Sequence, residues 1–227
     1  MFEECVDKVL IDAIDLIADS TIISKYNFYL AGGTSLALQL GHRESYDLDF
    51  FTQDKFRVDY IIAELETSYQ VRVINSDEDT LNCIISKDED ECKLSFFRTM
   101  YPLVSPTVRY RNIALANIED IAAMKMIAIA QRGSKKDFVD IYHILRDNRM
   151  TFEDIIKALK TKYVSVNFNL PLILRSLGYF VDADNDLDPK MKNHKGSGFD
   201  TLGSQEWARI KQFLLKIQKD KFGEAIQ

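Results

Sequence analysis

Residues 28–51, FYLAGGTSLALQLGHRESYDLDFF, constrain the fold of this chain more than any other part of the sequence. An apolar, β-prone run ends at a Gly-Gly pair, where the backbone can turn sharply and approach other groups closely. A helix-compatible segment follows, and Gly41 ends it. An Asp-Leu-Asp triplet at residues 47–49 then opens a second apolar run. The stretch therefore predicts a strand, a tight turn, a short helix and a second strand.

The Asp-Leu-Asp triplet predicts a pair of adjacent carboxylates. Residues two apart in a strand point to the same face, so Asp47 and Asp49 should stand side by side while Leu48 points into the core. Two carboxylates held this close repel one another unless a divalent cation lies between them. Aspartate is also common in surface turns at strand starts, and this alternative stays open for the motif taken alone.

The turn before the helix offers a second candidate site. Gly32, Gly33, Thr34 and Ser35 begin the expected helix, where free backbone N–H groups can bind phosphate. An ordinary strand-to-helix turn, with Thr34 or Ser35 as the cap, would have the same sequence. A phosphate seat about fifteen residues from a carboxylate pair together indicates metal-dependent chemistry on a nucleotide.

Composition excludes several classes of protein. The chain has 227 residues, of which 46% are hydrophobic, and no apolar run approaches the length of about twenty residues that spans a bilayer. The first ten residues lack the basic and long apolar regions of a signal peptide. The three cysteines form no CxxC pair and the three histidines are scattered. We therefore expect a cytoplasmic protein without membrane association, disulfides or a transition-metal site.

Charge is distributed unevenly along the chain. The formal net charge is −6, but residues 1–92 carry 20 acidic and 7 basic residues, whereas residues 93–227 carry 15 and 22. An acidic part that could hold metal beside a basic part that could meet a polyanion is one interpretation. Solvated charge on helix faces is the other.

Periodicity predicts an α+β protein with a mixed sheet lobe in residues 1–105 and a helical lobe in residues 106–227. Three β-like runs at 70–75, 80–86 and 92–100 are closely spaced, which favours antiparallel hairpins. Helices are expected at 3–19, 57–69, 118–131, 134–145, 151–162, 170–179 and 204–218. Ser134 and Asp137 have the spacing of a capping box. Residues 182–200, rich in Asp, Lys, Asn and Gly, are expected to form a long exposed loop.

Lys125 is anomalous because it lies in an otherwise apolar helix. A buried ammonium without a partner is costly, so Lys125 should reach a carboxylate, a phosphate or solvent. It could also extend along its methylene stem to the surface. Arg132 follows seven residues later on the same face, and Lys135 and Lys136 follow at the helix junction. Four cations along one edge would suit the oxygens of a triphosphate.

Asp137 and Asp140 lie one turn apart on the next expected helix. Asp137 is explained by a purely structural role as an acid at a helix start. Asp140 could pair with Lys136 across one turn. Either aspartate could instead hold Lys125 or the nucleotide.

Three blocks of the sequence, taken together, resemble the AbiEii/AbiGii toxin-type nucleotidyltransferases, which share a polymerase-β-like catalytic core. The blocks are FYLAGGTSLALQLGHRESYDLDFF, KLSFFRTMYPLV and IEDIAAMKMIAIAQRGSKKDFVDIYHIL, within residues 27–145. The resemblance implies that residues 1–105 form the catalytic core and that the helical lobe closes over the nucleotide. It also implies transfer of a nucleotidyl group from an NTP, dependent on Mg²⁺ or Mn²⁺. Family members act as toxins of abortive-infection, type IV toxin–antitoxin systems, and some modify the acceptor end of tRNA.

The resemblance assigns roles to particular residues. The phosphate-holding turn is matched by Gly32, Gly33, Thr34 and Ser35, and the metal pair by Asp47 and Asp49. The later motif, with catalytic and nucleotide-binding roles, is matched by Lys125, Asp137 and Asp140, with Arg132 and Lys136 as further nucleotide contacts. Many enzymes of the superfamily place a third carboxylate on a later strand. Ser95 occupies that place here, and a serine cannot supply the missing negative charge.

The sequence and the resemblance together predict a nucleotidyltransferase toxin whose acceptor is a hydroxyl group, with RNA or tRNA lying against the basic lobe and a cognate antitoxin as a further partner. Two alternatives remain at this point. The acceptor could be a small molecule. The chain could also be a non-catalytic member of the fold that binds a nucleotide or a protein partner, which the absent third carboxylate favours.

Overall fold

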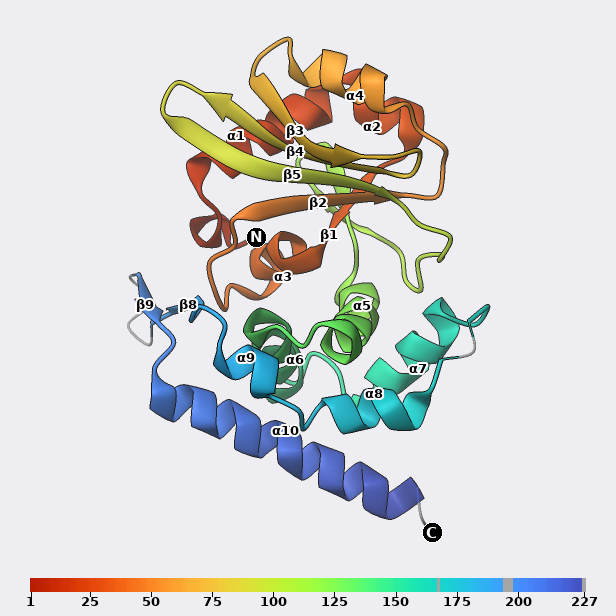
Figure 1. Cartoon of the computed structure of the whole chain (residues 1–227), viewed down its shortest axis with the longest axis vertical. Coiled ribbons are helices and arrows are strands. Elements are labelled where there is room, and N and C mark those ends of the chain that lie inside the picture. Colours follow the sequence, from red (N-terminus) through yellow and green to blue (C-terminus); the bar gives the residue numbers. More distant parts are fainter. Residues whose placement is uncertain (167, 194–197, 226–227) are drawn as a thin grey trace. The chain divides into compact units, whose positions relative to one another are not determined.

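The computed structural model describes residues 1–166, 168–193 and 198–225. The chain divides into two compact units (Figure 1). The sheet unit comprises Met1–Gly41 and Ser45–Asn117, and the helical unit comprises His42–Glu44 and Ile118–Gln227. Residues 106–117, which we expected in the helical lobe, thus belong to the sheet unit.

The sheet unit contains seven strands in the order β3-β4-β5-β2-β1-β7-β6. The strands are β1 (Tyr29–Ala31), β2 (Asp47–Thr52), β3 (Gln70–Ser76), β4 (Thr80–Lys87), β5 (Asp90–Arg98), β6 (Val108–Tyr110) and β7 (Ile113–Leu115). The pairs β2–β5 and β1–β7 are parallel and the other pairs are antiparallel, so the sheet is mixed, as predicted. The predicted hairpins β3–β4–β5 are confirmed.

Helices flank this sheet. They are α1 (Lys8–Asp19), α2 (Thr21–Tyr26), α3 (Gly32–Leu40) and α4 (Val58–Leu65), preceded by a 3₁₀ turn at Glu3–Cys5. Figure 1 shows α4 near β3 and β4, and α3 next to β1 and β2. Phe28, Phe50 and Phe96 form the aromatic centre of the core and all three are buried. The ring centroid of Phe96 lies 5.2 Å from that of Phe28 and 5.3 Å from that of Phe50. This packing holds the central strand β2, which carries both aspartates.

The helical unit contains α5 (Ile118–Gln131), α6 (Lys135–Arg146), α7 (Phe152–Lys162), α8 (Leu170–Ser176), α9 (Val181–Asp184) and α10 (Ser204–Ala225). A short antiparallel hairpin joins β8 (Lys190–Lys192) and β9 (Phe199–Thr201). The predicted long loop at 182–200 is therefore wrong in part, because it contains the end of α9 and this hairpin. Residues 194–197 of that loop lie outside the described residues. No helix among the described residues combines the length and apolar character that crossing a bilayer requires.

Two helix starts differ from what the sequence suggests. The predicted capping box at Ser134 does not form, because the Ser134 hydroxyl makes no cap hydrogen bond and instead donates to the Asp137 carboxylate, at 2.9 Å. A capping box does form at α7, where Thr151 and Asp154 satisfy each other's backbone N–H groups. The spacing of polar residues alone does not separate these two outcomes. A buried cation beside Asp137 draws its carboxylate away from the backbone.

Candidate nucleotide site

The two aspartates of β2 share one face of the sheet. Burial alternates along this strand, with Leu48 fully buried and Asp47 and Asp49 half-buried. The parallel neighbour β5 places Lys93 opposite Asp47 and Ser95 opposite Asp49. Because residues two apart in a strand point to the same face, the strand geometry agrees with the predicted side-by-side placement of the two carboxylates.

The Gly-Gly turn lies directly against one of these carboxylates. Ala31 pairs with Asp49 across β1 and β2, and Gly32 follows with a φ of +68°. A Cβ atom at Gly32 would lie 2.6 Å from Asp49 Oδ2, which is far inside van der Waals contact. Glycine is thus required at position 32 both for its backbone conformation and for the space that Asp49 occupies. The two motifs meet within the sheet unit.

Helix α3 begins at this turn and directs two hydroxyl groups inward. The Thr34 hydroxyl donates to the Asp47 carbonyl and shares a 2.8 Å hydrogen bond with the Ser45 hydroxyl. The Ser35 hydroxyl is fully buried and accepts from Gln39 Nε2 at 3.2 Å. The Thr34 hydroxyl therefore ties the start of α3 to β2, whereas the Ser35 hydroxyl bonds within α3. The backbone N–H groups of the first turn of α3 have no partner within the helix and are the donors that could meet a phosphate.

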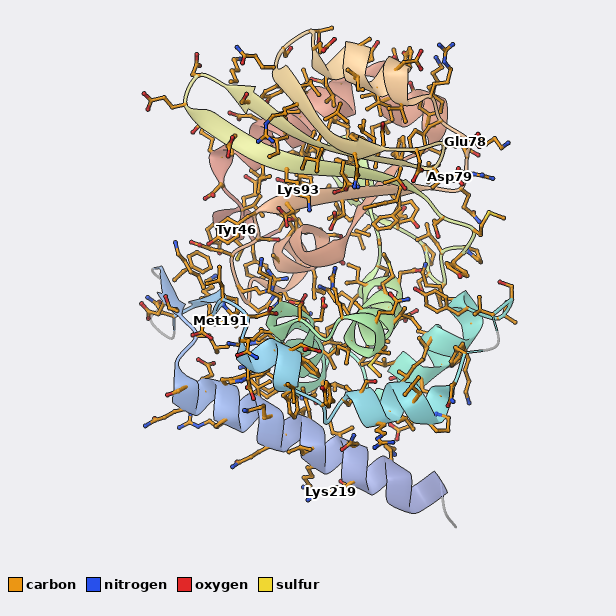
Figure 2. The ribbon with its side chains drawn as sticks, in the orientation of Figure 1. Tyr46, Glu78, Asp79, Lys93, Met191 and Lys219 are labelled. Carbon is orange, nitrogen blue, oxygen red and sulfur yellow. The ribbon has the colours of Figure 1, made fainter. Side chains whose placement is uncertain are left out.

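The strand beside the aspartates carries no acid at the expected place. Ser95, opposite Asp49, is 1% exposed, whereas Lys93, opposite Asp47, is exposed (Figure 2). No cluster of three or more His, Cys, Asp or Glu side chains within the described ranges is arranged to hold a metal ion. Lys93 was not singled out from the sequence, although its position two residues before Ser95 puts it on the same face.

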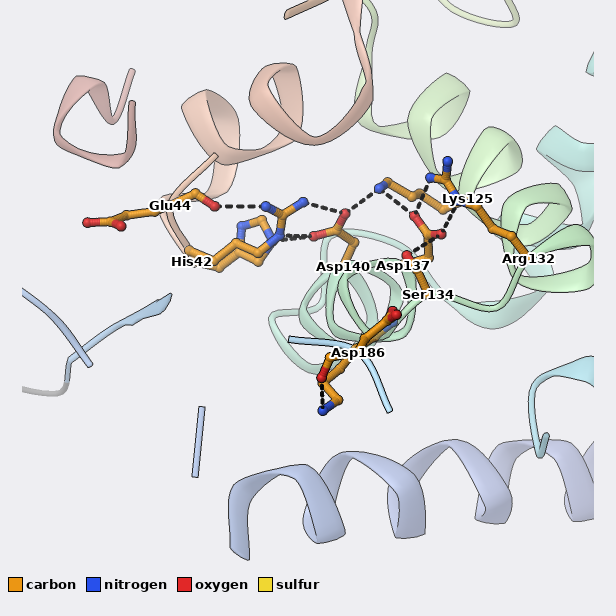
Figure 3. Close-up of polar contacts among 10 residues, drawn as sticks. His42, Glu44, Lys125, Arg132, Ser134, Asp137, Asp140 and Asp186 are labelled. Atoms are coloured by element: carbon orange, nitrogen blue, oxygen red, sulfur yellow. Dashed lines mark hydrogen bonds and ion pairs between the residues drawn. The ribbon is translucent and has the colours of Figure 1, made fainter. Parts of the chain in front are cut away.

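In the helical unit, Lys125 is 6% exposed and pairs with two carboxylates (Figure 3). Its Nζ atom lies 2.7 Å from Asp137 Oδ1 and 2.6 Å from Asp140 Oδ2. Burial alone would lower the pKa of Lys125, but the charges of Asp140 and Asp137 outweigh it, and the pKa is raised. The lysine is therefore a permanent cation, and the prediction that it reaches a carboxylate is confirmed.

The Asp137 carboxylate has four contacts. Besides Lys125, it accepts from Arg132 Nε at 3.0 Å, Arg132 Nη2 at 3.3 Å and the Ser134 hydroxyl at 2.9 Å. Burial raises the pKa of Asp137, but Lys125 and Arg132 outweigh it and the pKa is lowered. Arg132 is held by this pair at one end while 67% of its side chain stays exposed.

The Asp140 carboxylate is fully buried and pairs with residues that the sequence analysis did not single out. Arg43 Nε lies 2.7 Å from Oδ1, and Arg43 Nη2 lies 2.9 Å from Oδ2. His42 Nε2 lies 2.7 Å from Oδ1. Burial raises the pKa of Asp140, but Arg43 and Lys125 hold it well below its usual range. The signal for these partners was the Gly-His-Arg run directly after α3.

Lys135 and Lys136 do not share one environment. Lys135 is buried, and its Nζ atom contacts the Asp186 carbonyl at 2.9 Å and Asp188 Oδ1 at 2.8 Å. Lys136 is half-buried at the start of α6. The structure thus gathers Lys125, Arg132, Asp137 and Asp140 in the helical unit. The glycine turn and the aspartate pair lie in the sheet unit.

Comparisons with known proteins give the same fold. The chain is 38% identical over 165 residues to an uncharacterized protein, aq_aa25, of Aquifex aeolicus (strain VF5), covering 71% of this chain and 77% of that protein. The structure is similar to JHP933 of Helicobacter pylori, with a TM-score of 0.51, 15% identity and 97% coverage of both chains. It is also similar to an H. pylori protein considered a nucleotidyltransferase, with a TM-score of 0.55, 17% identity and coverage of 94% and 98%.

Residues 15–227 match the family described as "Nucleotidyl transferase AbiEii toxin, Type IV TA system". This match covers nearly the whole chain, including the glycine turn, the aspartate pair and the Lys125 cluster. The chain therefore belongs to the AbiEii family of toxin nucleotidyltransferases.

Proposed function

We propose that the protein transfers a nucleoside monophosphate from an NTP to a hydroxyl group of RNA, with Asp47 and Asp49 as the metal-binding residues. The observation that carries this proposal is the contact between Gly32 and Asp49, because it brings a helix start and a carboxylate pair together. An anion at the helix start and a cation at the carboxylates would then be neighbours, as a metal–NTP complex requires.

The residues on β2 fit Mg²⁺ or Mn²⁺. Both ions prefer oxygen ligands, and Mg²⁺ is usually bound through one or two carboxylates together with substrate phosphates and water. Asp47 and Asp49 supply two carboxylates on one face. When bound, the ion would offset phosphate charge and polarise the α-phosphate for attack.

Groups in each of the two units have the chemistry to bind phosphate. Backbone N–H groups of Gly33 and Thr34 at the start of α3 would hold phosphate oxygens. In the helical unit, Lys125 donates to Asp137 and forms an ion pair with Asp140, and its ammonium charge would attract a phosphate oxygen. Arg132 and Lys136 would add charge at the same group.

In the proposed reaction, the acceptor oxygen attacks the α-phosphorus, the bond to the β-phosphate oxygen breaks, and pyrophosphate leaves. The acceptor's proton must pass to water or phosphate, because the side chain opposite Asp49 is the neutral Ser95. We therefore expect a modest rate, since a positioned general base typically contributes 10²–10⁴-fold.

RNA is the acceptor that charge favours. Exposed basic residues lie on α7 and α10, where among the described side chains they outnumber the exposed acids Glu153, Asp154 and Asp220, while the exposed acids of 182–188 lie apart from them in sequence. The basic residues are Lys157, Lys160, Arg209, Lys216 and Lys219, and Lys219 extends outward from α10 (Figure 2). Lysine and arginine on helix surfaces contact phosphates without reading sequence. A toxin that modifies RNA with NTP would act in the cytoplasm, in an abortive-infection system controlled by an antitoxin.

The test is incubation of purified protein with each α-labelled NTP, Mg²⁺ and total RNA. We expect label in RNA and release of pyrophosphate. Asp49→Asn should reduce transfer by at least 10²-fold, whereas Asp19→Asn, at an exposed position on α1, should leave it unchanged. Label that enters small molecules alone would exclude RNA as the acceptor. Nucleotide binding without pyrophosphate release under any divalent metal would contradict transfer.

A further inference from the structure

We propose that Asp140 is a positioning residue that anchors the chain segment His42–Glu44, between α3 and the aspartates of β2, and orients Lys125. The sequence and the resemblance predict a catalytic role for Asp140. Its contacts with His42, Arg43 and Lys125 instead indicate that Asp140 holds these side chains in place. The activity part of this inference rests on the proposed function, and the structural part does not.

Protein groups surround the Asp140 carboxylate on both oxygens. An ionised carboxylate has about four acceptor sites. At Asp140, Oδ1 receives His42 Nε2 and Arg43 Nε, each at 2.7 Å, and Oδ2 receives Arg43 Nη2 at 2.9 Å and Lys125 Nζ at 2.6 Å. Three hydrogen bonds and one ion pair from protein groups therefore surround the carboxylate (Figure 3). Both oxygens are engaged where a metal ion or the proton of an acceptor hydroxyl would have to bind.

Arg43 and Asp140 form a buried, two-pronged ion pair. The guanidinium meets the carboxylate through two parallel hydrogen bonds, and its remaining edge donates from Nη1 to the Glu44 carbonyl at 2.8 Å. Arg43 is 1% exposed and Asp140 is fully buried. A buried pair of this kind is retained only when its groups are satisfied, and loss of one partner leaves an uncompensated buried charge. Lysine cannot reproduce the two-pronged contact.

The anchored segment His42–Glu44 belongs to the helical unit but lies between two parts of the sheet unit in the chain. Within the helical unit, the segment is also bonded to β8, with Glu44 N donating to the Lys190 carbonyl at 2.9 Å and Lys192 N donating to the His42 carbonyl at 3.0 Å. The residues on either side, Gly41 and Ser45, belong to the sheet unit.

Each flanking residue lies close to a nucleotide motif of the sheet unit. Gly41 is the C-cap of α3, whose first turn is the glycine turn. Ser45 shares a hydrogen bond with Thr34, and Asp47 follows two residues later. The segment held by Asp140 is therefore the covalent link between the phosphate-holding helix and the aspartate strand.

Asp140 also bears on the position of Lys125. The ammonium group donates to Asp137 and forms an ion pair with Asp140 at 2.6 Å, so the two carboxylates together fix where it lies. Removing the Asp140 charge would leave Lys125 held by Asp137 alone among these two aspartates and would remove the carboxylate that pairs with the buried Arg43 guanidinium. One substitution should therefore disturb the lysine and the segment at the same time.

The experiment compares Asp140→Asn with Asp120→Asn in the full-length protein. Asp120 is a matched control because it forms another buried pair in the same unit, with Lys162 at 2.8 Å. We expect Asp140→Asn to speed amide hydrogen exchange at residues 41–49 at least tenfold. Asp120→Asn should leave exchange there unchanged. This measurement needs no activity, so it succeeds or fails independently of the proposed function.

Metal binding separates a positioning role from a ligand role. We expect the midpoint of Mn²⁺ binding, measured by calorimetry with a non-hydrolysable NTP analogue, to change less than twofold in Asp140→Asn and at least tenfold in Asp49→Asn. Transfer by Asp140→Asn should fall roughly 10- to 100-fold in kcat with KM for NTP changed less than threefold. If Asp140→Asn does not fold, Arg43→Lys takes its place, with the same exchange and metal results expected.

Two results would overturn the inference. A tenfold shift of the Mn²⁺ midpoint in Asp140→Asn would make Asp140 a ligand. Unchanged exchange at residues 41–49 in a folded Asp140→Asn or Arg43→Lys protein would show that the carboxylate does not anchor the segment.

Discussion

Gly32→Ala tests the contact on which the proposed function depends. At a φ of +68°, an L-residue is strained by about 1–2 kcal/mol, and the lower entropy of the unfolded chain offsets about 0.4–1 kcal/mol of this. The new Cβ would also lie 2.6 Å from Asp49 Oδ2, whereas ordinary contact begins near 3.4 Å. The carboxylate or the turn must therefore move by about 0.8 Å, a displacement that can cost about 10²-fold in rate.

Gly133→Ala is the matched control. Its φ is +58°, so the backbone strain is similar, but its Cβ would lie 3.4 Å from the nearest atom, the Ile129 carbonyl oxygen. Both variants should lower the unfolding temperature, by roughly 2–4 °C per kcal/mol for a chain of this size. Only Gly32→Ala should lose transfer, which a label-incorporation assay under saturating Mg²⁺ would measure as a fall of about 10²-fold in kcat/KM.

Two outcomes of the comparison between Gly32→Ala and Gly133→Ala would contradict a role for the Asp49 position in the reaction. If Gly32→Ala is destabilised as much as Gly133→Ala and keeps wild-type kcat/KM, then the position of Asp49 does not limit the reaction. If both variants lose activity equally, backbone strain rather than the carboxylate contact is responsible.

Three further predictions concern other buried groups. Burial lowers the pKa of His143 to about 3, so His143 stays neutral in the folded protein while it is protonated below about pH 6.5 in the unfolded chain. The free energy of unfolding should therefore fall by up to roughly 1.4 kcal/mol per pH unit as pH drops from about 6.5 toward about 3. His143→Phe should reduce this pH dependence, as urea titrations at several pH values would show. Lys162→Met removes the cation that lies 2.8 Å from the buried Asp120 carboxylate. The substitution should cost about 3–5 kcal/mol in denaturant unfolding, and Asp120→Leu in the same protein should regain most of this. Ser95→Asp adds a carboxylate opposite Asp49, and should lower the unfolding temperature in chelator and recover it with Mg²⁺, as scanning fluorimetry would show.

The central part of the sheet unit was predictable because its signals are local. Alternation along residues 47–52 defines which faces are buried, and a Gly-Gly pair after an apolar run marks a turn that needs a positive φ. The short spacing of the three runs that form β3, β4 and β5 predicted antiparallel hairpins, and these are present. Each of these inferences depends on neighbours within a few residues, where sequence pattern is a direct physical signal.

The pairings between distant segments were not predictable in this way. Arg43 and Asp140 are separated by 97 positions, and no periodicity reports that they meet. The hairpin of β8 and β9 was missed because three-residue strands show almost no alternation. The Ser134–Asp137 spacing suggested a capping box, but the buried Lys125 and the Arg132 guanidinium draw the aspartate toward themselves. Tertiary electrostatics outweighed the local rule there.

The charge balance of the Lys125 cluster is compatible with the nucleotide-binding role that we propose for Lys125 and Arg132. Lys125, Arg132 and Arg43 contribute three positive charges, and Asp137 and Asp140 contribute two negative ones, while His42 is held neutral by burial. The cluster therefore keeps one net positive charge. Aspartates in this arrangement fix the direction of a cation without cancelling it, so the cluster can still attract a polyphosphate. A further acidic residue in the cluster, without a cation of its own, would cancel the net positive charge and remove that attraction.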